Sequence, residues 1–238
     1  MKNIKALFID CDGVLYDKNQ CSSHDMVDIG FGKTFEKYQI PFTEFTHKHI
    51  ELKQKGIRGV WNAVLDLCNK YHLSFSEFTK NVVNNTDYSL ISTDFEMLNL
   101  LKKVGTLIPT YIVTNNSAPH LNKIFACLNG GTALQNPQQE LNIHSITIEN
   151  TFYDGIFQSK KMETQLPKLC EQITCQTENV LLLDDTESVR KTAIDQGLKI
   201  TNTPIEKPED TKKILREALY FHTKDKPNMS SLFSERNL

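Results

Sequence analysis

Two short apolar segments, one at the start of the chain and one far downstream, run directly into pairs of acidic residues. The first covers residues 5–10 (KALFID) and continues as Cys11-Asp12-Gly13, and the second covers residues 180–184 (VLLLD) and continues as Asp185. A short, continuous apolar run is typical of a strand that is buried on both faces of a parallel sheet. Because the carboxyl ends of the central strands in such a sheet line its ligand crevice, we expect the two acidic pairs to lie close together.

The acidic pairs have the chemistry of a magnesium site. Asp10 and Asp12 are two residues apart on an extended chain, so their side chains point the same way and repel each other unless a cation or a proton lies between them. Asp184 and Asp185 add two carboxylates, and such hard oxygen ligands suit Mg²⁺. We therefore predict that Asp10, Asp12, Asp184 and Asp185 bind Mg²⁺. Alternatively, an acid at either position caps the following helix, which at the second segment explains one carboxylate but not the pair.

Two further polar features fit an anionic ligand. A predicted strand at residues 107–114 ends in the hydroxyl of Thr114, and a hydroxyl followed by loop amides can hold phosphate oxygens. Lys160 and Lys161 open a predicted helix, where a positive charge opposes the helix dipole and can instead neutralise a phosphate. The competing interpretations are that Thr114 is a helix N-cap and that the lysines are solvated surface residues.

Strand-like and helix-like segments alternate along most of the chain, which predicts an α/β fold with a parallel sheet. Residues 22–85 are the exception, since they show helical patterns but no convincing strand. We therefore predict a core of residues 1–20 and 88–222, an inserted helical cap of residues 21–87, and a polar, flexible tail of residues 223–238. The predicted helices are 56–71, 74–84, 94–104, 119–128, 161–173, 186–196 and 209–222, the remaining strands are 145–148 and 198–201, and residues 130–140 form a predicted surface loop.

Composition and net charge argue against a nucleic-acid-binding protein and against a membrane protein. The chain has 238 residues with 27 Lys and Arg against 29 Asp and Glu, so there is no basic excess to bind a nucleic-acid polymer. No stretch approaches the roughly 18 apolar residues of a membrane span, which argues against membrane insertion. The six cysteines show no C-x-x-C spacing, and we expect them to be reduced thiols of a cytoplasmic protein.

Taken in order, the four polar features resemble the four motifs of the haloacid dehalogenase superfamily of phosphohydrolases. The first motif, Asp-x-Asp-Gly-hydrophobic-Leu-x-Asp, matches residues 10–17, and the second, a strand ending in Thr or Ser, matches residues 112–115. The third, a lysine that begins a helix, fits Lys160 best, and the fourth, an apolar strand ending in Asp-Asp, matches residues 181–185. The resemblance implies a three-layer, Rossmann-like α/β core with a parallel sheet and an inserted all-helical cap.

The resemblance also implies roles for these residues. Asp10 would attack phosphorus to form an aspartyl-phosphate, and Asp12 would first protonate the leaving oxygen and then deprotonate the attacking water. Mg²⁺ would be held by Asp10, the backbone carbonyl of Asp12 and Asp185, while Asp184 would hold metal-bound water or share the ligation. The equatorial phosphate oxygens would be stabilised by Thr114, the Asn115 amide and Lys160.

A narrower resemblance concerns the predicted cap. Residues 53–62 (KQKGIRGVWN) are similar to the cap helix of the pyrimidine 5′-nucleotidase-like members of the superfamily, although Gly13 stands where those members usually have Asn. Lys53, Arg58 and Trp61 are therefore candidates for contacting a base, a sugar or a second anion. Packing of Trp61 inside the cap and solvation of Lys53 are the alternatives.

These features predict a Mg²⁺-dependent phosphomonoesterase for a small phosphorylated metabolite, with a nucleoside 5′-monophosphate as the first candidate. Asp12 favours phosphoryl transfer, because the dehalogenases of the superfamily lack this second acid. One alternative is a phosphatase or mutase that acts on a phosphosugar or another metabolite. The other is a catalytically silent binding protein built on the same scaffold.

Overall fold

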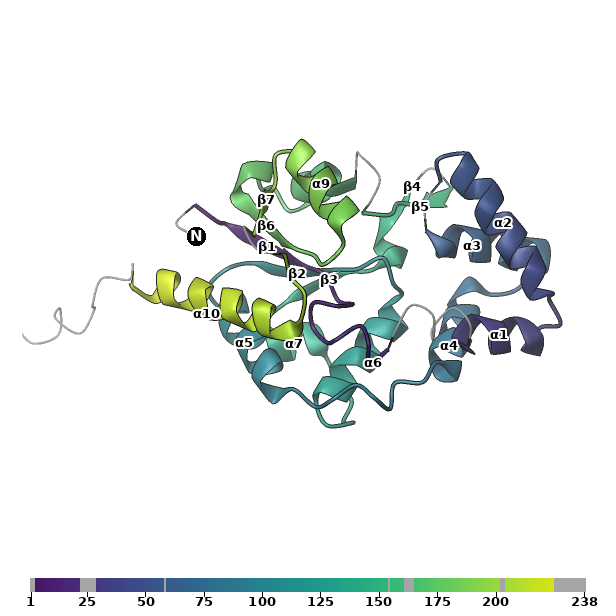
Figure 1. The fold of residues 1–238 in the computed structure, drawn as a ribbon, viewed down its shortest axis with the longest axis horizontal. Coiled ribbons are helices and arrows are strands. Elements are labelled where there is room, and N and C mark those ends of the chain that lie inside the picture. Colours follow the sequence, from purple (N-terminus) through teal and green to yellow (C-terminus); the bar gives the residue numbers. More distant parts are fainter. Residues whose placement is uncertain are drawn as a thin grey trace, which may run out of the picture.

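The structure is a computed structural model that describes residues 3–21, 29–57, 59–153, 155–160, 165–201 and 204–224. Its centre is a five-stranded parallel sheet in the order β3-β2-β1-β6-β7 (Figure 1). The strands are β1 (Ala6–Ile9), β2 (Thr110–Val113), β3 (His144–Ile146), β6 (Val180–Leu183) and β7 (Lys199–Ile200). The two strands that lead into acidic pairs, β1 and β6, are therefore neighbours in the middle of the sheet.

Helices cover both faces of this sheet and make three layers (Figure 1). The helices of the core are α5 (Phe95–Gly105), α6 (Ala118–Leu128), α7 (Pro137–Leu141), α8 (Gln165–Gln172), α9 (Glu187–Asp195) and α10 (Pro208–Lys224). Leu7 and Ile9 of β1 pack in one apolar cluster with residues of α5, α6 and α10, whereas Ala6 and Phe8 pack in another with residues of α8 and α9. Successive side chains of a strand point to opposite faces, so every residue of β1 is buried. The predicted three-layer α/β core is confirmed.

The first four helices form the inserted cap, which lies beside the core at the right of Figure 1. They are α1 (Gly32–Lys37), α2 (Phe42–Gln54), α3 (Val60–Lys70) and α4 (Phe75–Asn85). They bury a cluster of large aromatic rings, each at most 3% exposed, which includes Phe31, Phe35, Phe45, Trp61 and Phe78. The cap is helical as predicted, while its boundaries at 20/21 and 87/88 stay predictions, since residues 22–28 lie outside the described residues.

Each predicted helix has a counterpart in the structure. The helix predicted over residues 56–71 begins only at Val60, because Gly56 and Gly59 have positive φ angles, and residues 161–164 of the helix predicted over 161–173 lie outside the described residues. α4 begins as predicted, because the Ser74 hydroxyl accepts a hydrogen bond from the Glu77 amide. The Asp94 carboxylate accepts a hydrogen bond from the Met97 amide, so Asp94 is the N-cap of α5 and not its first residue. α10 continues past its predicted end at residue 222 to Lys224. The rest of the predicted flexible tail, residues 225–238, lies outside the described residues.

The prediction of a loop over residues 130–140 is wrong at its end, where α7 forms. The Asn136 side chain accepts a hydrogen bond from the Gln139 amide, and Pro137 takes the first helical position. The sequence pattern also does not predict the antiparallel hairpin of β4 (Phe152–Tyr153) and β5 (Ile156–Phe157), which follows the 3₁₀ helix of Ile148–Thr151. Two-residue strands are too short to show the alternation by which a strand is predicted.

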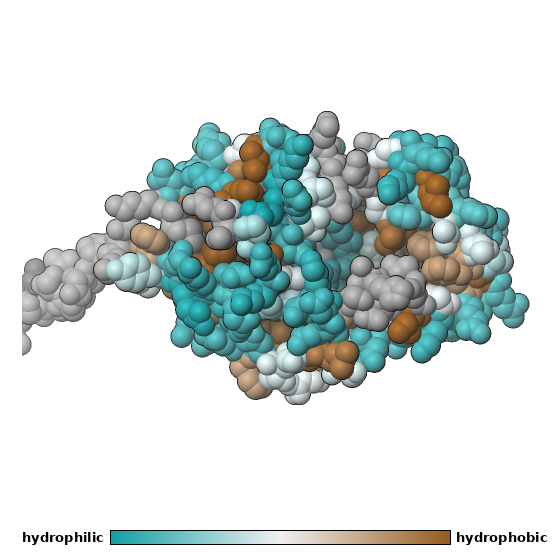
Figure 2. Space-filling view, viewed as in Figure 1, coloured by the Kyte–Doolittle hydropathy of each residue, from teal (hydrophilic) through white to brown (hydrophobic). Residues whose placement is uncertain are grey.

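The face of the molecule shown in Figure 2 is mainly hydrophilic, with apolar residues in small, separate groups. Scattered apolar side chains are ordinary on a globular surface and carry no functional signal by themselves. Among the described helices, none combines the length and the apolar character that crossing a membrane requires.

Candidate active site

The carboxyl ends of β1 and β6 bring two buried acids together. Ile9 pairs with Leu183 in the parallel ladder, and the backbone amide of Asp10 donates to the Leu183 carbonyl at 2.8 Å, so Asp10 and Asp184 follow side by side. Asp10 is 8% exposed and Asp184 is 1% exposed. Two carboxylates are thus withdrawn from water at the same edge of the sheet, where like charges are costly unless a cation accompanies them.

Lys160 supplies one such cation. Its Nζ atom lies 2.7 Å from Asp10 Oδ1 and 2.7 Å from Asp184 Oδ2, and the residue is 3% exposed. It follows the β4–β5 hairpin, and its backbone amide donates a hydrogen bond to Asn115 Oδ1 at 2.9 Å. Lys161, the other lysine of the predicted helix start, lies outside the described residues. The structure therefore brings Lys160 between two of the predicted acids.

A third acid, Asp185, completes a cluster of oxygen ligands. Carboxylate oxygens of Asp10, Asp184 and Asp185 all lie within 4.8 Å of one another. The chain passes this cluster at Gly13, whose φ is +74°, and a Cβ atom there would come 2.5 Å from Asp185 Oδ2. The left-handed backbone and this close approach both require glycine. Asp185 also forms an ion pair with the exposed Lys18, at 2.8 Å.

The cluster fits a hard divalent cation, because its three carboxylates outnumber the buried ammonium of Lys160. Burial raises the pKa of Asp10 well above its ordinary value, since desolvation outweighs the attraction to Lys160 and the charge of Asp184 adds repulsion. Burial by itself disfavours the ammonium, but the charges of Asp10 and Asp184 raise the pKa of Lys160. Mg²⁺ prefers oxygen ligands and would remove the excess negative charge, so Asp10, Asp184 and Asp185 are the residues that would hold it.

The carboxylate of Asp12 makes a different set of contacts. It accepts hydrogen bonds from the Tyr16 hydroxyl, the Asn116 side-chain amide and His120 Nε2, the last at 2.9 Å. Burial alone would raise the pKa of Asp12, but the charge of His120 and these three hydrogen bonds lower it to about 2. The side chain of Asp12 is therefore not one of the three clustered carboxylates, in contrast to its place among the four predicted ligands. The ligand that the resemblance implies is its backbone carbonyl.

Two residues outside the motifs extend this network. His120, on α6, is 1% exposed, and its Nδ1 atom lies 2.9 Å from the hydroxyl of Tyr88. An ionised carboxylate only accepts hydrogen bonds, so His120 Nε2 carries the proton that it donates to Asp12. A sequence signal for His120 exists, because the spacing of four places it on the same apolar helix stripe as Ile124 and Leu128.

The loop after β2 begins with Thr114 and Asn115, and Asn115 contacts the backbone of Lys160. Thr114 is 2% exposed, and its Oγ1 atom accepts a hydrogen bond from the Asn116 amide at 3.1 Å, which closes a local turn. The N-cap of α6 is Ser117, so the alternative that Thr114 caps this helix is wrong. The Asn115 carboxamide accepts from the Lys160 backbone amide, so this side chain holds the segment that carries the lysine. The contacts of Thr114 and of the Asn115 amide with phosphate stay predictions.

Of the three cap residues predicted to contact the substrate, the structure describes two. Trp61 is 1% exposed, and its ring centroid lies 5.0 Å from that of Phe31 in the apolar core of the cap. The structure thus shows the packing role of Trp61, and the predicted substrate contact is not supported. Lys53 is exposed on α2, and Arg58 lies outside the described residues.

Neither a protein-family model nor a curated protein sequence matches the chain. Solved structures do match it. CbbY from Rhodobacter sphaeroides, in complex with phosphate, is 14% identical with a TM-score of 0.54, over 84% of this chain and 86% of that chain. The HAD-hydrolase YfnB from Bacillus subtilis, bound to magnesium, is 16% identical with a TM-score of 0.52, over 90% and 99%. A HAD-superfamily hydrolase of subfamily IA from Geobacter sulfurreducens is 15% identical with a TM-score of 0.50, over 90% and 99%.

The chain has the haloacid dehalogenase fold. The shared features are the parallel sheet in the order β3-β2-β1-β6-β7 and the helical insertion after β1. At 14% and 16% identity, the likeness to CbbY and YfnB establishes the fold and does not identify a substrate. These neighbours give no support to the narrower resemblance of the cap to pyrimidine 5′-nucleotidases.

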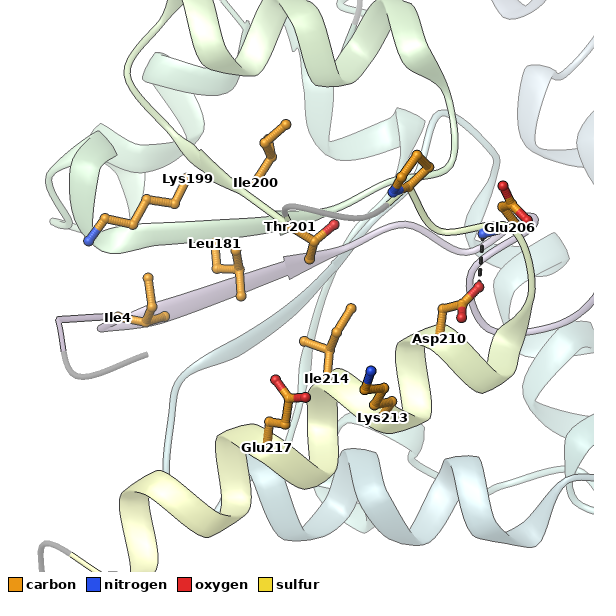
Figure 3. Close-up of a pocket in the computed structure, with 11 residues that line it drawn as sticks. Ile4, Leu181, Lys199, Ile200, Thr201, Glu206, Asp210, Lys213, Ile214 and Glu217 are labelled. Carbon is orange, nitrogen blue, oxygen red and sulfur yellow. Dashed lines mark hydrogen bonds between the residues drawn. The ribbon is translucent and has the colours of Figure 1, made fainter.

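A cavity of about 740 Å³ occupies another part of this haloacid dehalogenase fold, between the sheet and α10 (Figure 3). Its lining mixes apolar and charged side chains, among them Ile4, Leu181, Ile214, Lys199, Lys213 and Glu217. None of its described lining residues belongs to the acidic cluster. The candidate active site is therefore assigned from the chemistry of its side chains and not from this hollow.

Proposed function

We propose that the chain is a Mg²⁺-dependent phosphomonoesterase that hydrolyses a small phosphate ester. The observation that carries the proposal is the buried ammonium of Lys160, held between Asp10 and Asp184 beside Asp185. It joins a nucleophilic carboxylate, a positive charge and hard metal ligands at one sheet edge. The structural neighbours support the same chemistry, since YfnB was solved with magnesium and CbbY with phosphate.

The reaction divides into two displacements at phosphorus. In the first, an oxygen of Asp10 forms a bond to phosphorus, and the ester oxygen leaves with a proton from Asp12. In the second, Asp12 takes a proton from water, the water oxygen attacks phosphorus, and the bond to Asp10 breaks to release inorganic phosphate. Lys160 offsets the charge of Asp10 and of the phosphoryl group. Mg²⁺, when bound, supplies the charge neutralisation that allows two anions to approach each other.

The contacts of Asp12 suit the second displacement directly. With a pKa of about 2, its carboxylate is ionised at neutral pH, which is the form that can accept a proton from water. The first displacement needs the protonated form. Because a nearby negative charge raises the pKa of an acid, the arriving phosphate ester would favour proton uptake by Asp12.

For the substrate, we propose a nucleoside 5′-monophosphate or a phosphosugar. The nucleotide is favoured by the resemblance of residues 53–62 to a nucleotidase cap helix. The phosphosugar is favoured by a second structure of CbbY, which was solved in complex with xylulose-(1,5)-bisphosphate. Both are small phosphate esters, so they share the proposed chemistry and differ in what the cap must recognise.

The test is a phosphate-release assay with Mg²⁺ over nucleotides, phosphosugars and cofactor phosphates. We expect release from at least one class, and we expect Asp10→Asn to lower the rate by about a thousandfold or more because it removes the nucleophile. Asp195→Asn, at an exposed position of α9, is the control and should keep full activity. Activity of Asp10→Asn within a few-fold of wild type would refute the nucleophile. Phosphoryl transfer without phosphate release would indicate a mutase, and a flat response over the whole panel would indicate a silent binding protein.

A further inference from the structure

One asparagine of the cap acts as a hydrogen-bond partner for the backbone of the core. Asn62 lies in the first turn of α3 and is 3% exposed. Its Nδ2 atom donates to the Phe157 carbonyl at 2.9 Å, and its Oδ1 atom accepts from the Phe157 amide at 2.8 Å. One side chain thus satisfies both backbone polar groups of a buried residue, and losing it would leave both without a partner in the protein interior.

The residue held in this way lies three positions before Lys160, and the intervening residues are buried. The Gln158 amide donates to the Thr151 carbonyl at 2.8 Å, and the Lys160 amide donates to Asn115 Oδ1 at 2.9 Å. The segment is therefore fixed by the cap at residue 157 and by the core at residues 158 and 160. Three residues span at most about 10 Å, so the backbone of Phe157, which contacts Asn62, and the backbone of Lys160 cannot move far apart.

Packing strengthens the same connection. The Phe157 ring lies 4.8 Å from the ring of Phe75 on α4, and Phe157 belongs to the apolar cluster of the cap. Gly59, just before α3, lies against the segment as well, since a Cβ atom there would be 3.9 Å from Ser159 Cβ. A shift of α3 relative to the sheet would therefore move the backbone that carries Lys160.

We propose that Asn62 is a positioning residue that couples the cap to Lys160. It holds the backbone of residues 157–160 so that the ammonium reaches Asp10 and Asp184 together. The position of the cap then determines whether the Lys160 ammonium lies between the carboxylates of Asp10 and Asp184 and offsets their negative charges. The catalytic consequence rests on the proposed phosphomonoesterase function, whereas the placement of the lysine does not.

The experiment compares Asn62→Ala with Asn85→Ala, which makes the same chemical change elsewhere in the cap. Asn85, on α4, donates to Thr34 Oγ1 at 3.0 Å, so its bond lies wholly within the cap. One measurement is the rate at which an amine-reactive reagent acylates Lys160, read from the modified peptide by mass spectrometry. The other is kcat and KM for p-nitrophenyl phosphate with Mg²⁺.

In Asn62→Ala we expect Lys160 to be acylated about fivefold faster or more, because the segment opens more often. We expect kcat to fall about tenfold while KM changes by less than about threefold, since the lost interaction acts on the reacting groups. Asn85→Ala should keep both values within about twofold of wild type. If Asn62→Ala does not fold, Asn62→Asp keeps the volume and the acceptor but lacks the donor, and the same measurements apply.

Unchanged acylation and an unchanged kcat in the folded variant would overturn the coupling. Equal effects of Asn85→Ala would overturn it as well, because they would trace to the stability of the cap as a whole. Acylation of Lys160 does not require catalytic turnover, so the coupling through Asn62 and the proposed phosphomonoesterase function are tested independently. Faster acylation in a protein that releases no phosphate supports the coupling and refutes the proposed function, whereas an active wild type with no response to Asn62→Ala refutes the coupling alone.

Discussion

At the scale of single residues, the two acids of the first motif differ in their surroundings although they are two positions apart. Asp10 is buried against Lys160 and Asp184, and burial raises its pKa, whereas Asp12 accepts three hydrogen bonds and its pKa falls to about 2. In the proposed reaction Asp10 is the nucleophile, which must be ionised, so it depends on the charge of Lys160 and on a bound cation to offset the cost of its burial. Asp12 is the acid and base of the proposed reaction, and it needs the charge of the arriving phosphate ester to take up its proton.

Because the pKa of Asp12 is low, the free energy of unfolding changes with pH in the acidic range. Its folded-state pKa of about 2 lies below the ordinary value of about 3.9, so the ionised carboxylate stabilises the fold above about pH 4 and this contribution is lost as the pH falls toward 2. We expect the free energy of unfolding to fall more steeply between pH 4 and pH 2 in wild type than in Asp12→Asn. Urea denaturation at several pH values measures both slopes, and equal slopes would contradict the assignment.

The sequence predicts the acids of the site better than it predicts their partners. Asp10 and Asp184 follow apolar runs that predict central strands, and parallel pairing then brings the two strand ends together. The network of Asp12, His120 and Tyr88 joins residues 108 and 32 positions apart, and no local pattern records such a contact. Trp61 shows the same limit, since an aromatic residue on a cap helix has one pattern whether it contacts a ligand or packs inside.

At the scale of elements, the 3₁₀ helix of Ile148–Thr151 stabilises the start of α6 from outside. Both carboxylate oxygens of Glu149 accept from the Ala118 amide, at 3.2 and 3.1 Å, and the side chain of the N-cap residue Ser117 makes no capping bond. A carboxylate at this position satisfies a free helix amide and interacts favourably with the helix dipole.

We expect Glu149→Ala to lower the free energy of unfolding by about 1 kcal/mol, which is typical for the loss of an N-terminal cap. Glu149→Gln should lose roughly half as much, because its amide oxygen still accepts the hydrogen bond while the charge is gone. Urea denaturation of the three proteins at neutral pH provides the comparison. No loss in either variant would show that the contact does not stabilise α6.

Element length decides which parts of the fold the sequence can predict. α4 and α6 have apolar stripes long enough to predict a helix, and the Ser74 cap fixes where α4 begins. The β4–β5 hairpin and α7 are too short for periodicity, although Asn136-Pro137 is a typical helix start that the surrounding loop composition obscures. The hairpin matters for the site, since it leads directly to Lys160.

At the scale of the whole molecule, the division into core and cap follows from the absence of strand patterns in residues 22–85. The contact that connects the two parts does not follow from the sequence, because Asn62 and Phe157 are 95 positions apart. Ile148 and Phe157 also complete the apolar cluster of the cap from the core side. The cap is thus packed onto the segment that carries the site, in addition to being joined to the core through the chain.

A cation bound at the acidic cluster would make the stability of the whole molecule depend on Mg²⁺. Asp10 follows β1, and Asp184 and Asp185 follow β6, so a cation bound by all three would join two strands that are far apart in the sequence. The unfolded chain does not bring these carboxylates together and so lacks the site. A ligand that binds only the folded state stabilises it in proportion to the logarithm of its concentration, by about 2.7 kcal/mol when the free ligand is a hundredfold above Kd.

We therefore expect Mg²⁺ to raise the Tm of the wild-type protein above its value in EDTA, and the rise to grow with Mg²⁺ concentration. Asp185→Asn should reduce this rise strongly, because it removes a charged ligand from the folded state, whereas Asp195→Asn, on the exposed surface of α9, should leave it unchanged. Thermal unfolding followed by circular dichroism over a Mg²⁺ titration measures all three. An equal rise in the Asp185→Asn and Asp195→Asn variants would place the stabilising cation elsewhere. No rise in wild type at saturating Mg²⁺ would refute the metal site, since a cation that balances these three carboxylates must favour the state in which they meet.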